Sequence, residues 1–82
     1  MPVVSRFYGI VIKMYFNDHL PAHFHVIYGE YVGLYRLDDI AVIEGDLPAK
    51  AHQLVVEWAL AHQNELTQMW QSKEFHIIEG LK

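Results

Sequence analysis

Cysteine is absent from this chain of 82 residues. Its absence excludes disulfide bonds, thiolate metal sites and cysteine nucleophiles. Long apolar runs are absent as well, since none approaches the roughly 20 residues that a membrane-spanning helix needs. The apolar stretch over residues 7–16 is interrupted by Lys13 and lacks a small-residue cleavage site, which is not the pattern of a secretory signal. We therefore expect a cytoplasmic protein without a membrane partner.

Positive charge is scarce. Ten Asp and Glu residues outnumber six Lys and Arg residues, which gives a formal net charge of −4. The basic residues are spread along the whole chain: Arg6, Lys13, Arg36, Lys50, Lys73 and Lys82. Nucleic-acid affinity depends largely on clustered Lys and Arg that neutralise phosphates. Arg6, Lys13 and Arg36 would form a patch only if neighbouring strands brought them together, so the sequence disfavours nucleic acid as a partner.

The first part of the chain has the composition of a β-sheet. Between residues 7 and 45, β-branched and aromatic residues form short runs separated by turn residues, which predicts a meander of strands. We expect strands over residues 7–16, 23–28, 31–36 and 40–44. Gly29 and Glu30 predict a tight hairpin turn. In the first run the even positions are all apolar and are expected to face the core: Tyr8, Ile10, Ile12, Met14 and Phe16.

The second part predicts one long helix over residues 48–71, a span with no internal Gly or Pro. Pro48 suits the first turn of a helix, and Asp46 is the expected N-cap. One broad stripe of the helix is expected to pack on the sheet: Ala51, Leu54, Val55, Trp58, His62, Leu66 and Met69. A short tail over residues 75–82 follows, in which residues 75–78 would add an edge strand.

These elements predict a single domain over residues 1–82. The expected fold class is α+β, with a four- or five-stranded, largely antiparallel sheet and one long C-terminal helix packed on one face. His62 and Glu65 are three residues apart on the helix, so we interpret them as a histidine paired with a carboxylate at the rim of the core. Val56 and Leu60 lie opposite the stripe and, together with Trp70, offer a candidate homodimer or partner surface.

Histidines are concentrated in one short segment. Three of the six, His19, His23 and His25, fall within seven residues. Residues two apart on a strand point to the same side, so His23 and His25 are expected to project together from an open face. Two imidazoles can reach one metal ion at about 2.0–2.1 Å. His19, held by the turn at Pro21, is the candidate third ligand.

A metal site is one interpretation of this cluster. The predicted ligands of a divalent transition metal are His19, His23, His25 and Glu30, with Asp18 as a further candidate carboxylate. The alternative is that these are polar residues on the solvent face of the sheet, with turn hydrogen bonds made by Asp18 and His19.

The same histidines allow two enzymatic functions. With an open metal position they would suit a metal-dependent hydrolase. Without a metal they would suit a ribonuclease, in which His23 and His25 act as general base and acid and Arg6 or Arg36 stabilises the charge of the phosphorane. The acidic balance of the chain disfavours the ribonuclease.

Several sequence blocks also carry a family resemblance. They are SRFYGIVI over residues 5–12, MYFNDHLPAHFHVIYGE over residues 14–30, EGDLP over residues 44–48, and the helical residues Glu57, Trp58, Ala59 and His62. In these blocks the chain resembles a family of small bacterial proteins that is catalogued as a domain of unknown function. Ala22 departs from the pattern, because the family often has a second proline there, and this affects the rigidity of the turn.

The resemblance implies a partner rather than a mechanism. Members of that family are often encoded next to a second short protein, in an arrangement similar to a toxin–antitoxin pair. The resemblance does not identify a catalytic residue or a cofactor. We therefore expect a protein-interaction component of a toxin–antitoxin-like module, with a histidine-cluster enzyme as the alternative.

Overall fold

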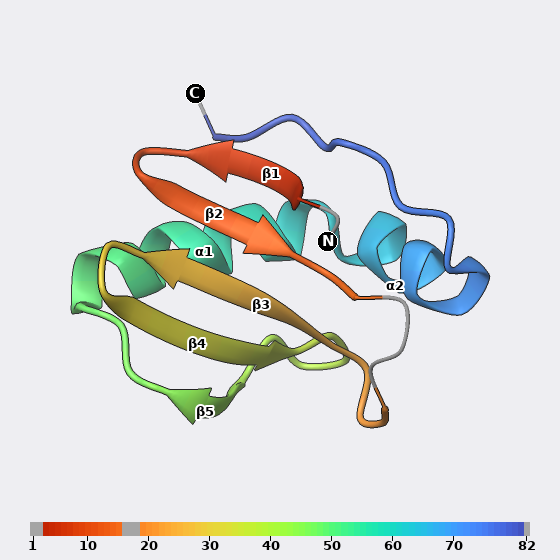
Figure 1. Cartoon of the computed structure of the whole chain (residues 1–82), viewed down its shortest axis with the longest axis horizontal. Coiled ribbons are helices and arrows are strands. Elements are labelled where there is room, and N and C mark those ends of the chain that lie inside the picture. Colours follow the sequence, from red (N-terminus) through yellow and green to blue (C-terminus); the bar gives the residue numbers. More distant parts are fainter. Residues whose placement is uncertain (1–2, 16–18, 82) are drawn as a thin grey trace.

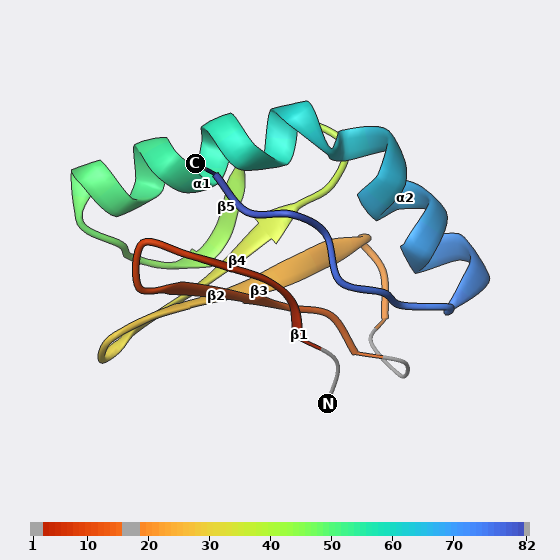
Figure 2. The ribbon, with the colours of Figure 1, turned by 90° about the horizontal axis from the view of Figure 1, so that it is seen from above.

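The computed structural model describes residues 3–15 and 19–81. Within these residues, five strands form one antiparallel sheet in chain order (Figure 1): β1 (Val3–Phe7), β2 (Ile10–Lys13), β3 (His23–Tyr28), β4 (Tyr31–Arg36) and β5 (Val42–Gly45). The helices α1 (Ala49–Ala61) and α2 (Gln63–Ser72) lie on one face of the sheet (Figure 2). Within the described residues, neither helix is long and apolar enough to cross a membrane. The predicted α+β fold with an antiparallel sheet is confirmed.

The predicted first strand is a hairpin instead, so this prediction was wrong. β1 ends at Phe7, β2 begins at Ile10, and these two residues pair across a two-residue turn. The turn residues Tyr8 and Gly9 have φ angles of 50° and 80°. Positive φ at both central residues defines the hairpin turn whose twist best matches that of the strands. Tyr8 is therefore 57% exposed at the hairpin tip rather than in the core. Phe16, the predicted end of this strand, lies outside the described residues.

The core lies between the sheet and the two helices. Ile10, Ile12 and Met14 are fully buried, as the alternation of the first run predicts. Trp58 of α1 is also fully buried and stacks on Phe7, with ring centroids 5.5 Å apart. Much of the predicted helical stripe is buried with it: Ala51, Val55, Leu66 and Met69. The stripe therefore packs on the face of the sheet that the sequence predicts.

The single helix predicted over residues 48–71 is divided at His62, where α1 ends and α2 begins. The backbone N–H of His62 is shared between the carbonyl oxygens of Trp58 and Ala59, at 3.2 Å each. A straight helix over the predicted span would be about 36 Å long, whereas the largest extent of the molecule is 31 Å. The bend turns α2 toward the end of the sheet (Figure 2), where its apolar residues are buried.

The predicted start of β5 and the predicted N-cap of α1 were also wrong. β5 begins at Val42 rather than at Ile40, because Ile40 adopts a φ of 54° in a turn that Asp39 closes with a 3.1 Å side-chain hydrogen bond. Asp46 is not the N-cap of α1. The N-cap is Pro48, which makes no side-chain capping hydrogen bond. Asp46 therefore has no capping role and instead lines a cavity beside the start of α1.

The tail after α2 runs alongside β1 (Figure 1). The backbone N–H of Ile78 donates a 2.6 Å hydrogen bond to the carbonyl of Val4, and the indole N–H of Trp58 donates a 3.0 Å bond to the carbonyl of Glu79. Gly80 passes so close to β1 that a Cβ atom there would lie 2.7 Å from its backbone. The edge strand predicted in this tail is not formed in the described residues, but the tail still covers the β1 edge.

Candidate functional sites

The predicted histidine cluster lies where β3 begins, near the end of the sheet that α2 covers. His23 is only 7% exposed and is not on an open face as expected. Its ring lies 5.4 Å from the ring of Trp70, centroid to centroid, and its Nδ1 lies 2.7 Å from the carbonyl oxygen of Pro21. The helix bend at His62, which the sequence does not predict, brings Trp70 to this position. The burial of His23 is a consequence of that bend.

His25 remains partly accessible beside it. The ring centroids of His23 and His25 are 5.1 Å apart, and Tyr15 packs edge-on against His25 at 4.5 Å. His19, His23 and His25 line one depression of about 250 Å³. Its other lining residues are Leu20, Pro21, Leu34, Ile43 and Glu44. The fold therefore brings the three predicted histidines to one place.

The predicted carboxylate ligands do not join them. Glu30 lies in the turn between β3 and β4, at the opposite end of β3 from His23. Asp18 lies outside the described residues. Among residues 3–15 and 19–81, no three His, Asp or Glu side chains are grouped closely enough to hold a metal ion. A divalent metal at this cluster stays a prediction.

The two arginines that were candidates for charge stabilisation lie far apart in the sheet. Arg6 is on β1, whereas Arg36 is on β4, opposite His23 in the strand register. Arg36 donates two side-chain hydrogen bonds of 3.2 Å to Asp39, and these bonds hold the pKa of the Asp39 carboxyl below its ordinary value. Arg36 thus already has an anionic partner. Lys13 lies on β2, so the strands do not gather the three basic residues into one patch.

Two interpretations of the helix have different outcomes. His62 Nδ1 lies 3.9 Å from a carboxylate oxygen of Glu65, too far for a hydrogen bond, and the hydrogen-bonded partner of Glu65 is His76 at 2.5 Å. The predicted surface of Val56, Leu60 and Trp70 is not formed, because Trp70 is 8% exposed and Val56 packs partly against the core. Leu60 is the member of this trio that stays largely exposed.

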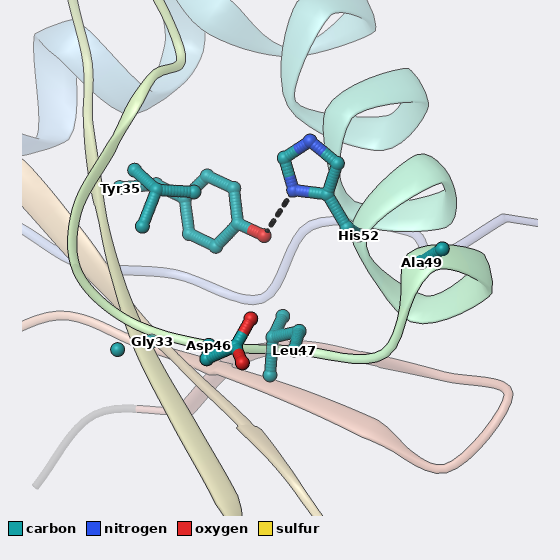
Figure 3. A pocket seen from close by; sticks show the side chains of 8 residues that line it. Gly33, Tyr35, Asp46, Leu47, Ala49 and His52 are labelled. Carbon is teal, nitrogen blue, oxygen red and sulfur yellow. Dashed lines mark hydrogen bonds between the residues drawn. The ribbon is translucent and has the colours of Figure 1, made fainter.

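A second site lies between β4, β5 and the start of α1, and the sequence did not predict it (Figure 3). The hydroxyl of Tyr35 lies 2.7 Å from His52 Nδ1, and the two rings stack with centroids 5.6 Å apart. Tyr35 is 1% exposed. The pair borders a cavity of about 380 Å³. The remaining lining residues are Gly33, Val42, Gly45, Asp46, Leu47 and Ala49.

The protonation of this pair follows from burial. Desolvation raises the pKa of Tyr35 to about 12, so the phenol keeps its proton at neutral pH and can donate it to His52 Nδ1. The lone pairs of the phenol oxygen then remain available as acceptors. The carboxylate of Asp46 enters the same space from the loop between β5 and α1 (Figure 3). The cavity therefore offers two acceptor groups, the Tyr35 hydroxyl and the Asp46 carboxylate, within a largely apolar lining.

Two glycines allow this cavity to exist. Gly45 has a φ of 92°, and a Cβ atom there would lie 2.1 Å from the carbonyl oxygen of Val32. A Cβ atom on Gly33 would lie 3.3 Å from the ring of Tyr35 and 3.6 Å from Leu47. Side chains at these positions would separate β5 from β4 or push the tyrosine ring from its place. Both glycines thus hold the cavity walls together.

A partial signal for this site was present in the sequence. Alternation along residues 31–36 places Tyr35 on the same side as Gly33, facing the helix. A buried tyrosine hydroxyl normally has a hydrogen-bond partner. His52 lies in the first turns of α1, which crosses that face. The pattern could have indicated that Tyr35 needs a partner, but not which residue supplies it.

Comparison with known protein families matches residues 9–71 to a domain of unknown function, DUF4160. This chain belongs to the DUF4160 family. The matched range includes the histidine cluster and the Tyr35–His52 cavity, so both candidate sites belong to the DUF4160 domain. β1 and the tail that covers it lie outside the matched range. Comparisons with curated proteins and with solved structures gave no match.

Proposed function

We propose that this DUF4160 protein acts by binding a second protein along the β5 edge of its sheet. The observation that carries the proposal is the difference between the two edges. The tail covers the β1 edge through the hydrogen bond from Ile78 to Val4. All four residues of β5 are exposed, and no strand of the described residues pairs with its outer side. An uncovered edge presents backbone N–H and C=O groups to which another chain can add a strand.

The side chains around β5 support a protein partner. Val42 and Ile43 of β5 and Val32 of β4 are between 44% and 53% exposed. Adjacent exposed aliphatic residues are typical of interaction sites, whereas single ones are ordinary. Val42 lines the Tyr35 cavity and Ile43 lines the histidine depression. A strand added to β5 would therefore find apolar contacts on both faces of the sheet.

Charge favours a basic partner over a second copy of this chain. The segment over residues 36–46 contains one basic residue, Arg36, and four acids: Asp38, Asp39, Glu44 and Asp46. Two copies joined edge to edge would bring these acids together, which repels them, whereas a basic strand would be attracted. A second small protein encoded alongside fits this role, as in a toxin–antitoxin-like module.

Co-purification tests this function. The chain is co-expressed with the protein encoded next to it, and the two are expected to elute as one complex at micromolar concentration. Ile43→Lys places a charge on the edge and should weaken the complex at least tenfold. Leu60→Lys makes the same change on an exposed position of α1 and should not. Failure to associate, or equal effects of the two variants, contradicts the proposal.

The histidine depression supports a second candidate function, a metal-dependent hydrolase or a metal-free ribonuclease. The supporting observation is that His19, His23 and His25 line the same depression. Zinc titration of the protein, followed by the imidazole NMR signals of these residues, tests the metal-dependent form. Stoichiometric binding that shifts all three signals supports it, and independent titration of the three without zinc binding contradicts it. The ribonuclease form predicts that His25→Ala abolishes RNA cleavage while the fold is retained.

A further inference from the structure

We propose that the Tyr35–His52 cavity binds the ammonium group of a lysine side chain, carried by the strand that adds to β5. The inference rests on the proposed function, because the lysine belongs to the same partner. It also concerns a separate feature, since the cavity lies on the helix side of the sheet and the pairing groups of β5 lie along its edge. The two proposals can therefore fail separately.

The polar groups of the cavity match a cationic donor. In the tautomer in which His52 Nδ1 accepts the phenol proton, the Tyr35 oxygen is left as an acceptor for a further hydrogen bond. Asp46 contributes a carboxylate, and no described residue donates a hydrogen bond or forms an ion pair with it. An ammonium group carries three donors and a positive charge, which complements the Tyr35 hydroxyl oxygen and the Asp46 carboxylate. An anionic ligand would instead meet the Asp46 charge.

The rest of the lining matches an aliphatic chain. Val42, Leu47 and Ala49 supply apolar walls around the ring of Tyr35. The volume of about 380 Å³ is at the small end of the range of about 300–1,000 Å³ that ligand cavities occupy. Lysine has a flexible four-carbon stem that can bury against such walls while its charged end reaches a carboxylate. An arginine guanidinium could pair with both oxygens of Asp46, but its donors are fixed in one plane, whereas the three donors of an ammonium group can turn toward Asp46 and Tyr35 together.

The cavity lies next to β5, so a side chain of a strand added to β5 can reach it. Val42 and Gly45 belong to β5 and also line the cavity, and they pair with Tyr35 and Gly33 of β4. A strand added to the outer side of β5 would lie about 4.8 Å from it, with alternate side chains on the helix side. One of these side chains would stand beside Val42 at the mouth of the cavity. A single lysine at that position would couple strand addition to recognition of charge.

A free lysine derivative tests the cavity without the partner. Nα-acetyl-lysine methylamide is titrated into the intact protein while the ring signals of His52 are followed by NMR. Saturable shifts of His52 are expected. Asp46→Asn should weaken this binding at least tenfold, and the matched control Glu57→Gln, an exposed acid on α1 outside this cavity, should leave it unchanged. Asp46 is exposed, so the variant is expected to fold.

Two further probes define the ligand chemistry. The corresponding norleucine derivative keeps the aliphatic chain without the charge and should not bind. The arginine derivative should bind at least several-fold more weakly than the lysine derivative. Equal binding of the arginine or norleucine derivative, or an unchanged affinity in Asp46→Asn, would overturn the assignment.

The outcome for the cavity is distinguishable from that for the edge. If the partner protein binds wild type and Asp46→Asn equally while the lysine derivative causes no shift, the lysine inference fails and strand addition stands. If the lysine derivative binds through Asp46 but no partner associates with the chain, strand addition fails and the cavity remains an ammonium site.

Discussion

The indole N–H of Trp58 donates a 3.0 Å hydrogen bond to the backbone carbonyl of Glu79. Trp58 is fully buried in the core, so this bond ties the tail to the core. The tail in turn lies along β1, where Ile78 bonds to Val4. Sheet edges are prone to unwanted pairing unless something covers them. The protein thus covers one edge of its sheet and exposes the other.

Gly80→Ala should displace the tail from β1. A Cβ atom at this position would lie 2.7 Å from both the carbonyl oxygen of Arg6 and the Cβ of Phe7. Overpacking of this kind typically lowers the free energy of unfolding by about 1–3 kcal/mol. Urea denaturation measures the loss, and faster amide exchange in β1 would locate it. Unchanged stability would mean that the tail does not hold the β1 edge.

Gly45→Ala should be more damaging than Gly29→Ala. Both glycines have positive φ, 92° and 59°, so both variants carry backbone strain of about 1–2 kcal/mol. At Gly45 the added Cβ atom also meets the carbonyl of Val32 at 2.1 Å, whereas at Gly29 nothing lies within 4 Å. Thermal unfolding of the two variants should show a clearly larger loss for Gly45→Ala, together with loss of partner binding. Equal losses would mean that β5 is not held close to β4.

Tyr35→Phe should destabilise the protein by about 1 kcal/mol at neutral pH, the usual net value of one hydrogen bond. Burial raises the pKa of Tyr35 from 10.0 to about 12, so the folded state favours the protonated phenol. That stabilising contribution is complete below pH 10 and is lost as the pH rises toward 12.

The pH dependence separates this effect from simple loss of packing. Between pH 10 and 12 the stability of wild type should fall more steeply than that of Tyr35→Phe, as followed by urea denaturation at each pH. Tyr31→Phe is the control, because Tyr31 is 42% exposed. Parallel pH profiles of wild type and Tyr35→Phe would show that Tyr35 does not titrate differently on folding.

Ser5→Ala should leave the protein as stable as wild type or make it more stable by about 1 kcal/mol. Ser5 is 1% exposed, and its hydroxyl has no hydrogen-bond partner among the described residues. Removing an unpaired buried hydroxyl removes a desolvation cost. Thermal unfolding measures the change. A loss of stability would show that the hydroxyl is hydrogen-bonded in solution.

The sequence predicts the central strands well and the first hairpin poorly. Residues 23–36 alternate on both sides of Gly29, a residue suited to the positive φ of a tight turn. The sequence does not predict the turn at Tyr8 and Gly9, because Tyr8 adopts a positive φ that is usual for Gly, Asn or Asp and uncommon for tyrosine. A two-residue turn also places Phe7 opposite Ile10, and an irregularity in the β1 register between Val3 and Ser5 puts both Val4 and Phe7 in the core.

The candidate sites divide in the same way. The spacing of His23 and His25 predicts that they project from one side of a strand, whereas their meeting with His19 in one depression is seen only in the fold. Tyr35 and His52 are 17 residues apart and meet only because α1 crosses the sheet. His23 is buried against Trp70 of α2, which lies there because the helix bends at His62. Such relationships between elements are not encoded in the periodicity of either element.

Amide hydrogen exchange of the complex tests the central claim most directly, because strand addition must protect backbone N–H groups at the edge that receives it. Exchange is compared between the free chain and its complex with the protein encoded alongside. We predict that amides within β5 (Val42–Gly45) exchange at least tenfold more slowly in the complex, while those of β1 (Val3–Phe7) are unchanged. Protection at β1 or on the helices with none at β5 would contradict the account.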